Sequence, residues 1–168
     1  MNKKETLQYS FLFFGGGENI YGFQTDNLID YQVKFKDTAY LFDGYLSTKL
    51  YAYEMGIQVA NNPTNQRPPL DSRIPFTIAA IFRDFFSRNN EQVVIYICDS
   101  SDSKQAIRHR KFNQWVEAFK GNDFVKIDAD ITDYEYIVYF TSLILRRDNP
   151  NRLIITEAFF SLTDDQQK

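Results

Sequence analysis

An unbroken run of six apolar residues, Val93–Cys98, lies between two segments with helical periodicity and constrains the fold more than any other feature. In the preceding segment, residues 71–88, apolar side chains recur at intervals of three and four, as one face of a helix requires. The second helical segment spans residues 102–120 and ends at Gly121. A strand that is apolar throughout is typical of a position covered on both faces, and helices on either side favour crossover connections. The sequence therefore predicts a sheet that is at least partly parallel.

The first seventy residues are predicted to be strands separated by turns. The alternation of Tyr31, Val33 and Phe35 with polar residues indicates a half-buried strand. Further predicted strands before the first helix cover residues 9–14, 20–25, 40–46 and 50–59. The segment NNPTNQRPPL, residues 61–70, contains three prolines and predicts a loop within one domain.

After the second helix, the sequence predicts two more strands, residues 124–129 and 134–145, and a closing helix after Pro150, although the β-branched start of this last segment also suits a strand. A chain of 168 residues is long enough to bury one core. We therefore expect an α/β (α+β) protein with one domain over residues 1–168. Its sheet is expected to be mixed and mostly antiparallel, flanked by two or three helices, with the N-terminal strands in the same sheet as the rest.

Composition excludes several functional classes. The formal net charge of −3 argues against a dedicated nucleic-acid binder. The single cysteine, Cys98, cannot form an intramolecular disulfide, which favours a reducing compartment. The longest apolar run is much shorter than a membrane span of ~20 residues, so we expect a cytoplasmic chain without membrane association. Eleven tyrosines predict that the N-terminal strands contact a protein partner or a second copy in a homodimer.

Catalytic and metal-binding residues are not identified by the sequence. One histidine and one cysteine are too few for the common zinc sites, so no metal is expected. Asp128 and Asp130 share a predicted strand face, which suits either a cation or a solvated edge, and the solvated edge is favoured. His109 is the only candidate base for a catalytic triad, but no serine lies in a GxSxG elbow.

The stretch ICDSSDSKQAIRHRK, residues 97–111, holds the candidate binding residues. Hydroxyl and backbone N–H donors at a helix start, followed by cations, form a reasonable anion or phosphate site at the carboxyl end of a strand. The candidate ligand-binding residues are Ser100, Ser101, Ser103, Lys104 and Arg108. The alternative is that the serines only cap the helix and the cations are solvated.

Arg108 is the candidate that solvation explains least. At 100° per residue it shares a helix face with Gln105, His109 and Phe112, whereas Arg110 points to water. An arginine on an apolar face either forms an ion pair beneath the sheet or meets a ligand at its rim. The ion pair is the favoured interpretation.

Three stretches resemble an uncharacterised bacterial family of unknown function, found mainly in Bacteroidota. They are RPPLDSRI with TIAAIFRDFF, YICDSSDSKQAIRHRKFNQW, and ILRRDNPNR. The likeness covers most of the chain and implies no activity.

The order of elements, with strands followed by helix, strand, helix and two strands, is similar to that of GCN5-related N-acetyltransferases. In that family a glycine-rich turn before the first helix binds the pyrophosphate of acyl-CoA, and an opening beside the following strand holds the acyl chain. The corresponding turn here, Leu70–Phe76, has no glycine. At the second helix, Ser103 and Arg110 stand where that family often has asparagine and a proton-donating tyrosine.

Two functional hypotheses follow, and the sequence leaves open whether the chain is an enzyme. The favoured one is a small, non-catalytic binding or interaction protein. The alternative is an acyl-CoA-dependent N-acyltransferase, active or degenerate, for which the resemblance implies CoA or acetyl-CoA as the cofactor.

Overall fold

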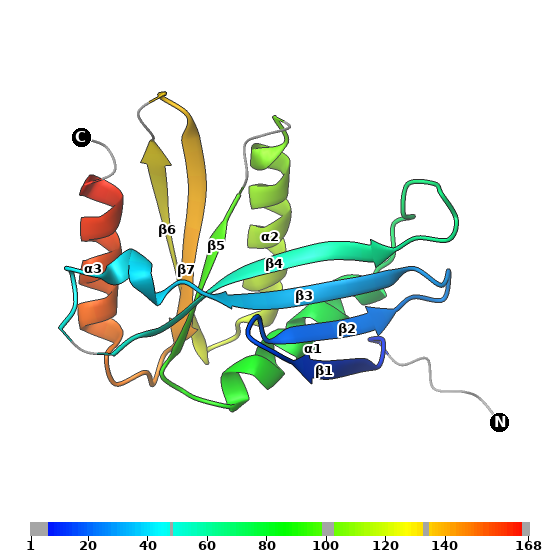
Figure 1. Ribbon diagram of the computed structural model, residues 1–168, viewed down its shortest axis with the longest axis horizontal. Coiled ribbons are helices and arrows are strands. Elements are labelled where there is room, and N and C mark those ends of the chain that lie inside the picture. The colour runs from blue at the N-terminus through cyan, green and yellow to red at the C-terminus, as the bar shows by residue number, and fades with distance from the viewer. Residues whose placement is uncertain (1–6, 48, 99–102, 133–134, 166–168) are drawn as a thin grey trace. The chain divides into compact units, whose positions relative to one another are not determined.

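The computed structural model describes residues 7–47, 49–98, 103–132 and 135–165. The described strands, shown in Figure 1, are β1 (Phe11–Gly15), β2 (Ile20–Gln24), β3 (Asp30–Asp37), β4 (Tyr51–Asn61), β5 (Gln92–Ile97), β6 (Phe124–Thr132) and β7 (Val138–Arg146). The described helices are the 3₁₀ helix η1 (Ala39–Phe42) and the α-helices α1 (Arg73–Ser87), α2 (Gln105–Phe119) and α3 (Arg152–Asp165).

The seven strands are hydrogen-bonded in the order β1-β2-β3-β4-β5-β7-β6. Strand β4 pairs with β5 in parallel, and α1 lies between them in the chain. The pairs β1/β2, β2/β3, β5/β7 and β6/β7 are antiparallel. The predictions of a mixed, mostly antiparallel sheet that includes the N-terminal strands, and of two or three flanking helices, are therefore confirmed.

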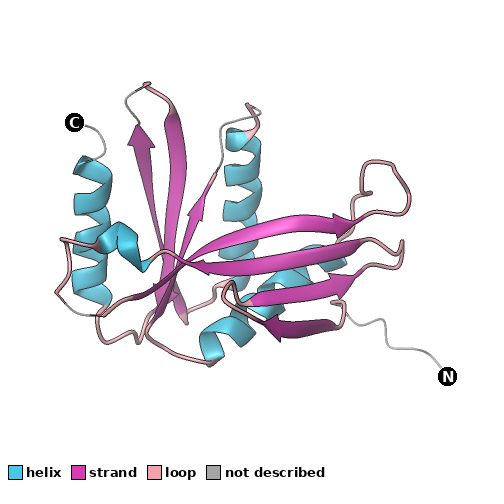
Figure 2. Cartoon of the chain, in the orientation of Figure 1, coloured by secondary structure: helices cyan, strands magenta, loops and turns pink. Residues whose placement is uncertain are grey.

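The chain divides into two compact units, one formed by residues 1–36 and 56–88 and the other by residues 37–55 and 89–168. Strand β4 contributes residues to both units. The loop between β4 and α1 contains neither helix nor strand, as its prolines predict (Figure 2). The expectation of a single domain stays a prediction.

The core of the first unit is aromatic. Phe35 of β3 stacks on Phe85 of α1 with ring centroids 3.9 Å apart, and Tyr21 of β2 meets Phe35 edge-on. As predicted from periodicity, Ile78, Ile81 and Phe85 are buried on the face of α1. Since side chains alternate along a strand, this packing leaves the other face of β1 and β2 uncovered by α1.

The core of the second unit lies between its strands and α3. Val93, Leu143 and Leu145 pack with Phe159, and all four are fully buried. The alternating residues of the same strands, which include Tyr96 and Phe140, face α2. In this unit, α2 and α3 therefore cover opposite faces of the strands.

The prediction of a strand over residues 40–46 is wrong, because this segment begins with η1. The Asp37 carboxylate accepts a hydrogen bond from the Ala39 amide at 2.9 Å, and the Leu41 amide donates to the Thr38 carbonyl. These local bonds turn the chain, and Phe42 enters the core of the second unit. Turn chemistry thus prevails over the β-propensity of Tyr40 and its neighbours.

The second helix begins later than predicted, at Gln105 rather than near residue 102. Ser103 has a φ of 59°, in the left-handed region, and therefore does not continue the helix backward. Lys104 occupies the N-cap position with no side-chain hydrogen bond to the first turn. The predicted cap, Ser101 or Asp102, lies outside the described residues.

Candidate functional site

Three of the five predicted ligand-binding residues lie within the described part of the chain. Ser103 and Lys104 are exposed immediately before α2, and Arg108 is half-buried one turn into the helix. The Lys104 carbonyl accepts the amides of Ile107 and Arg108, both at 3.1 Å. Ser100 and Ser101 lie outside the described residues. Whether these residues bind an anion together stays a prediction.

The helical-wheel placement of Arg108 and His109 is confirmed. The His109 ring stacks over Phe140 of β7 with centroids 4.8 Å apart, and Phe112 stacks on Tyr96 of β5 at 3.7 Å. Arg108 lies on the same side of α2, where its charge acts on the ionisation of Tyr96 and Cys98. Arg110 is exposed, as predicted.

Arg108 therefore lies at the carboxyl end of β5, close to the Tyr96 hydroxyl and the Cys98 thiol. Burial raises the pKa of the Cys98 thiol, and the Tyr96 hydrogen bond and the Arg108 charge oppose this effect only in part. Burial also raises the pKa of Tyr96, and the neighbouring Cys98 adds to the rise. Both groups consequently keep their protons near neutral pH. A buried thiol in this form is a poor nucleophile.

A second polar group lies on the face of the strands covered by α2, and of its members sequence reasoning had singled out only Asp128. Asp128 of β6 accepts hydrogen bonds from Lys126 and from the Ser142 hydroxyl of β7, the latter at 2.7 Å. Burial alone would raise the pKa of Asp128, but these hydrogen bonds and the Lys126 charge hold it below its usual value. Asp128 is thus a stable anion engaged by neighbouring side chains, in keeping with the favoured solvated-edge interpretation.

His109 makes a polar contact with Asn113, one turn further along α2, at 3.0 Å between Nε2 and Nδ2. Buried Nδ1 of His109 and Oδ1 of Asn113 have no hydrogen-bond partner among the described residues. The Ser142 hydroxyl donates to the Asp128 carboxylate rather than to the His109 ring. This arrangement is therefore not the serine–histidine pair of a catalytic triad, in which the hydroxyl gives its proton to the imidazole.

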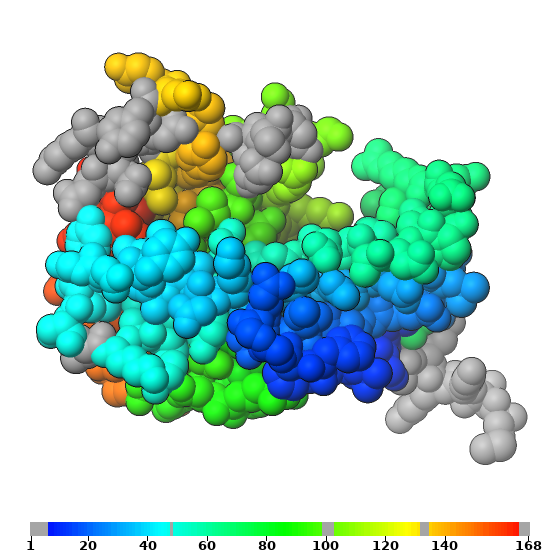
Figure 3. Space-filling view, in the orientation of Figure 1, coloured from blue at the N-terminus to red at the C-terminus, as the bar shows by residue number. Residues whose placement is uncertain are grey.

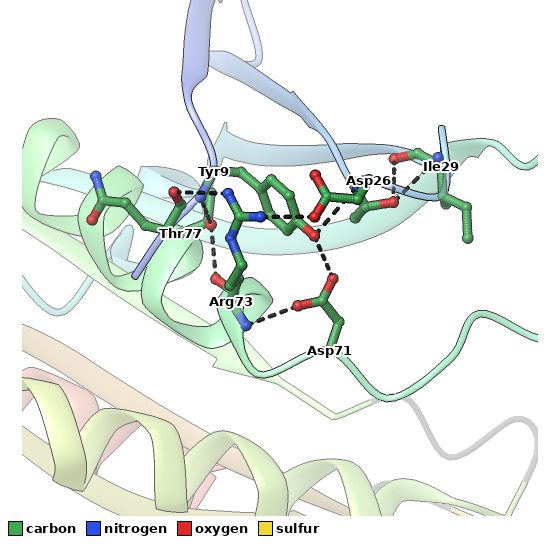
Figure 4. A network of polar contacts seen from close by, with 8 residues as sticks. Tyr9, Asp26, Ile29, Asp71, Arg73 and Thr77 are labelled. Carbon is green, nitrogen blue, oxygen red and sulfur yellow. Dashed lines mark hydrogen bonds and ion pairs between the residues drawn. The ribbon is translucent and has the colours of Figure 1, made fainter. Parts of the chain in front are cut away.

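The start of α1, where the acetyltransferase resemblance places the pyrophosphate turn, is occupied by the chain's own carboxylates (Figure 4). Asp71 accepts the Arg73 amide at 2.9 Å and the Tyr9 hydroxyl at 2.6 Å, and Asp26 pairs with the Arg73 guanidinium at 2.9 Å. Pro75 in the first turn has no amide hydrogen to donate. A phosphate would meet negative charge here instead of free N–H donors.

Tyr9 makes two further contacts that hold the N-terminal segment against α1. Its amide donates to the Thr77 hydroxyl at 2.8 Å, and the Arg73 guanidinium lies 3.8 Å from the centre of its ring. Burial, followed by the hydrogen bond to Asp71, raises the pKa of Tyr9. These contacts stabilise the packing of the N-terminal segment on α1, and the network therefore has a structural role within the first unit.

The described residues include neither a metal-binding cluster nor a membrane-spanning helix. No group of three or more histidine, cysteine, aspartate or glutamate side chains there is arranged to hold a metal ion. Within the same residues, every helix is too short or too polar to cross a membrane.

The structure is similar to that of ribosomal-protein-S5-alanine acetyltransferase from Vibrio fischeri, with 12% sequence identity and a TM-score of 0.47. The match covers 79% of this chain and 63% of that chain, so the chain spans less than two thirds of that protein's length. No curated protein matches the sequence. Residues 70–161, more than half of the chain, match a family of unknown function, DUF6169. From α1 to the last turns of α3, the sequence carries the pattern of that family, and the chain belongs to it.

Proposed function

We propose that this chain is a non-catalytic binding protein that pairs with a second copy of itself along the free edge of β1. The observation that carries the proposal is the exposure of apolar side chains on an edge strand. Leu12 and Phe14 of β1 are 65% and 63% exposed, and β1 is the outermost strand in the hydrogen-bonding order. Figure 3 shows the deep-blue segment that includes β1 open to the viewer.

An edge strand of this composition is unusual because proteins normally protect such edges with charge or proline. The residues Phe11–Phe14 contain neither. Their ladder with β2 is regular from Phe11 to Phe13, and its register shifts only at the far end. No other strand in the described part of the chain pairs with this edge, so its outward N–H and C=O groups are available to another strand.

A second copy suits this edge because antiparallel pairing about a two-fold axis places the same strand opposite itself. Since Phe11–Phe14 has no charged side chain, no like charges meet in such a pair. Among the tyrosines of the N-terminal strands, Tyr9 and Tyr21 are buried within the first unit and do not reach this edge. The contact surface that we propose is therefore formed by leucine and phenylalanine.

The non-catalytic part of the proposal rests on the state of the candidate nucleophiles. The Cys98 thiol is buried and its pKa is raised. The Ser142 hydroxyl donates its hydrogen bond to the Asp128 carboxylate. The net charge of −3 does not suit a nucleic-acid partner. The single, free cysteine supports a cytoplasmic location, where thiols stay reduced.

Light scattering is expected to find a dimer for the wild-type chain and a monomer for Leu12→Lys. The substitution places two like charges across the symmetric strand pair and is expected to weaken dimerisation by about tenfold or more. Leu70→Lys is the matched control, because Leu70 is 98% exposed outside β1 and its replacement should leave the dimer intact. A wild-type chain that stays monomeric at every concentration, or a Leu12→Lys chain that stays dimeric, would contradict the proposal.

The second candidate function, an acyl-CoA-dependent N-acyltransferase, is favoured by one observation. The β4/β5 ladder runs from the Tyr51/Gln92 pair to the Glu54/Ile95 pair and ends there, whereas β5 continues to Ile97. A ladder continuing to the end of β5 would have closed the place where the resemblance puts the acyl chain. The carboxylates at the start of α1 oppose this candidate, since they occupy its expected pyrophosphate position.

Dephospho-CoA is expected to leave the melting temperature unchanged at millimolar concentration. This ligand retains the pyrophosphate that an acyltransferase site would bind but lacks the 3′-phosphate monoester. A ligand at one hundred times its Kd stabilises a protein by ~2.7 kcal/mol, which a thermal-shift assay detects readily. A saturable rise in melting temperature with dephospho-CoA would favour the acyltransferase over the binding protein.

A further inference from the structure

The start of α3 gathers arginines around a surface cavity that neither function above uses. The cavity has a volume of about 530 Å³ and is lined by residues 147–154. These residues lie in the stretch ILRRDNPNR and the first turn of α3, within the second unit. Small-molecule sites commonly have volumes of this order.

The cavity is lined by two arginines, Arg147 and Arg152, and by Asp148, whose carboxylate pairs with Arg146 just outside the lining. Arg146 binds the Asp148 carboxylate through two hydrogen bonds of 2.7 and 2.8 Å, so these two charges compensate each other. Arg147 instead donates from Nε to the Asn122 carbonyl at 2.7 Å, and Arg152 donates from Nη1 to the Arg147 carbonyl at 2.9 Å. Main-chain carbonyls therefore hold these two guanidinium groups in place, and no carboxylate among the described residues is bonded to either of them.

The helix itself adds to this positive potential. The first turn of α3 has no acidic residue, and no hydrogen bond within the described residues uses the amides of Leu153 or Ile154. Free amides at a helix N-terminus carry partial positive charge and favour an anion. Arginines at this end of a helix are electrostatically unfavourable unless an anion is present.

A buried, unpartnered donor supplies an independent observation. Asn149 lines the cavity and is only 4% exposed, and its Oδ1 accepts the Asn151 amide at 2.9 Å. The other atom of the same amide group, Nδ2, is buried without a hydrogen-bond partner among the described residues. Leaving such a donor unsatisfied costs about 1 to 3 kcal/mol, so a bound acceptor that reaches Nδ2 is favoured.

We propose that this cavity binds the phosphate group of a small phosphate monoester. Arg147 and Arg152 supply charge, and the amides of Leu153 and Ile154 supply directed donors. A phosphate dianion has three terminal oxygens that accept several such hydrogen bonds at once. The side chain of Leu153, 72% exposed, offers an apolar contact for the remainder of the molecule.

Nuclear magnetic resonance titration of the full chain tests the proposal, with phenyl phosphate and inorganic phosphate as probes. We expect saturable shifts of the Leu153 and Ile154 amides and of the Asn149 side-chain amide, with phenyl phosphate bound more tightly than inorganic phosphate. Sodium chloride at equal ionic strength should not reproduce the shifts. Shifts that do not saturate, or that sodium chloride reproduces, would overturn the proposal, and inorganic phosphate bound more tightly would overturn its monoester part.

Single-residue variants distinguish a specific phosphate site from nonspecific attraction between opposite charges. Arg147→Gln is expected to weaken phenyl phosphate binding at least tenfold, with Arg152→Gln as the second variant if the first does not fold. Arg110→Gln removes an exposed charge from α2 and should bind like the wild type. Equal affinities of the folded variant and this control would show that no specific site exists. Because the titration does not measure β1 pairing, its failure is distinct from failure of the dimer proposal.

Discussion

Replacing Phe35 with alanine is expected to lower the free energy of unfolding by about 3 to 5 kcal/mol, the range typical for deleting a buried phenylalanine ring. Phe35 is fully buried and stacks on Phe85 with nearly parallel rings, so its loss leaves a cavity between β3 and α1. Urea denaturation followed by circular dichroism measures the change. Leu70→Ala, at a position outside any packed contact, should stay within about 0.5 kcal/mol of the wild type.

The same variant tests the prediction of a single domain. Phe35 belongs to the first unit, whereas Trp115, the single tryptophan, lies on α2 in the second. If the chain unfolds as one domain, Phe35→Ala shifts the midpoint of tryptophan fluorescence as far as that of circular dichroism. A fluorescence midpoint that does not move would show that the second unit unfolds independently and would contradict the single-domain prediction.

Local patterns in the sequence predicted most of the fold. The three-and-four spacing of Ile78, Ile81 and Phe85 located α1, and the apolar run 93–98 located β5 and indicated that part of the sheet is parallel. Residues 40–46 were misassigned because their aromatic content resembles that of the neighbouring strands. The deciding interaction is the Asp37 carboxylate bonded to the Ala39 amide, which composition alone does not reveal.

The candidate sites were predicted less completely because they depend on contacts between distant residues. Helical periodicity correctly placed Arg108 and His109 toward the strands, since the period of one helix is a local property. The Asp128–Ser142 contact depends on β7 lying beside β6 in a particular register. The sequence shows Arg147 and Arg152 close together along the chain. It does not reveal the main-chain carbonyls that orient their side chains.

The free energy of unfolding of the wild-type chain is expected to fall by about 2 to 3 kcal/mol as the pH rises from 10 to 12, because Tyr21 ionises. Its ring is fully buried, and its hydroxyl donates to the Asp84 carboxylate at 2.7 Å. Burial and this hydrogen bond raise the pKa of Tyr21 from 10.0 to about 12, although Arg88 opposes the rise. Ionisation would place a phenolate beside a carboxylate in the core of the first unit.

The direction of the effect follows from the order in which the two states lose the proton. The unfolded chain releases it near pH 10, whereas the folded chain holds it until about pH 12. The stabilising contribution is therefore complete below pH 10 and is lost as the pH rises through the folded-state pKa. Urea denaturation from pH 9 to 12 measures the loss, and Tyr21→Phe is the control because it keeps the ring and removes the ionising group. Other tyrosines with raised pKa values, including Tyr9 and Tyr96, add to the slope in both proteins. The difference between the two slopes therefore isolates Tyr21, and identical slopes would refute this assignment.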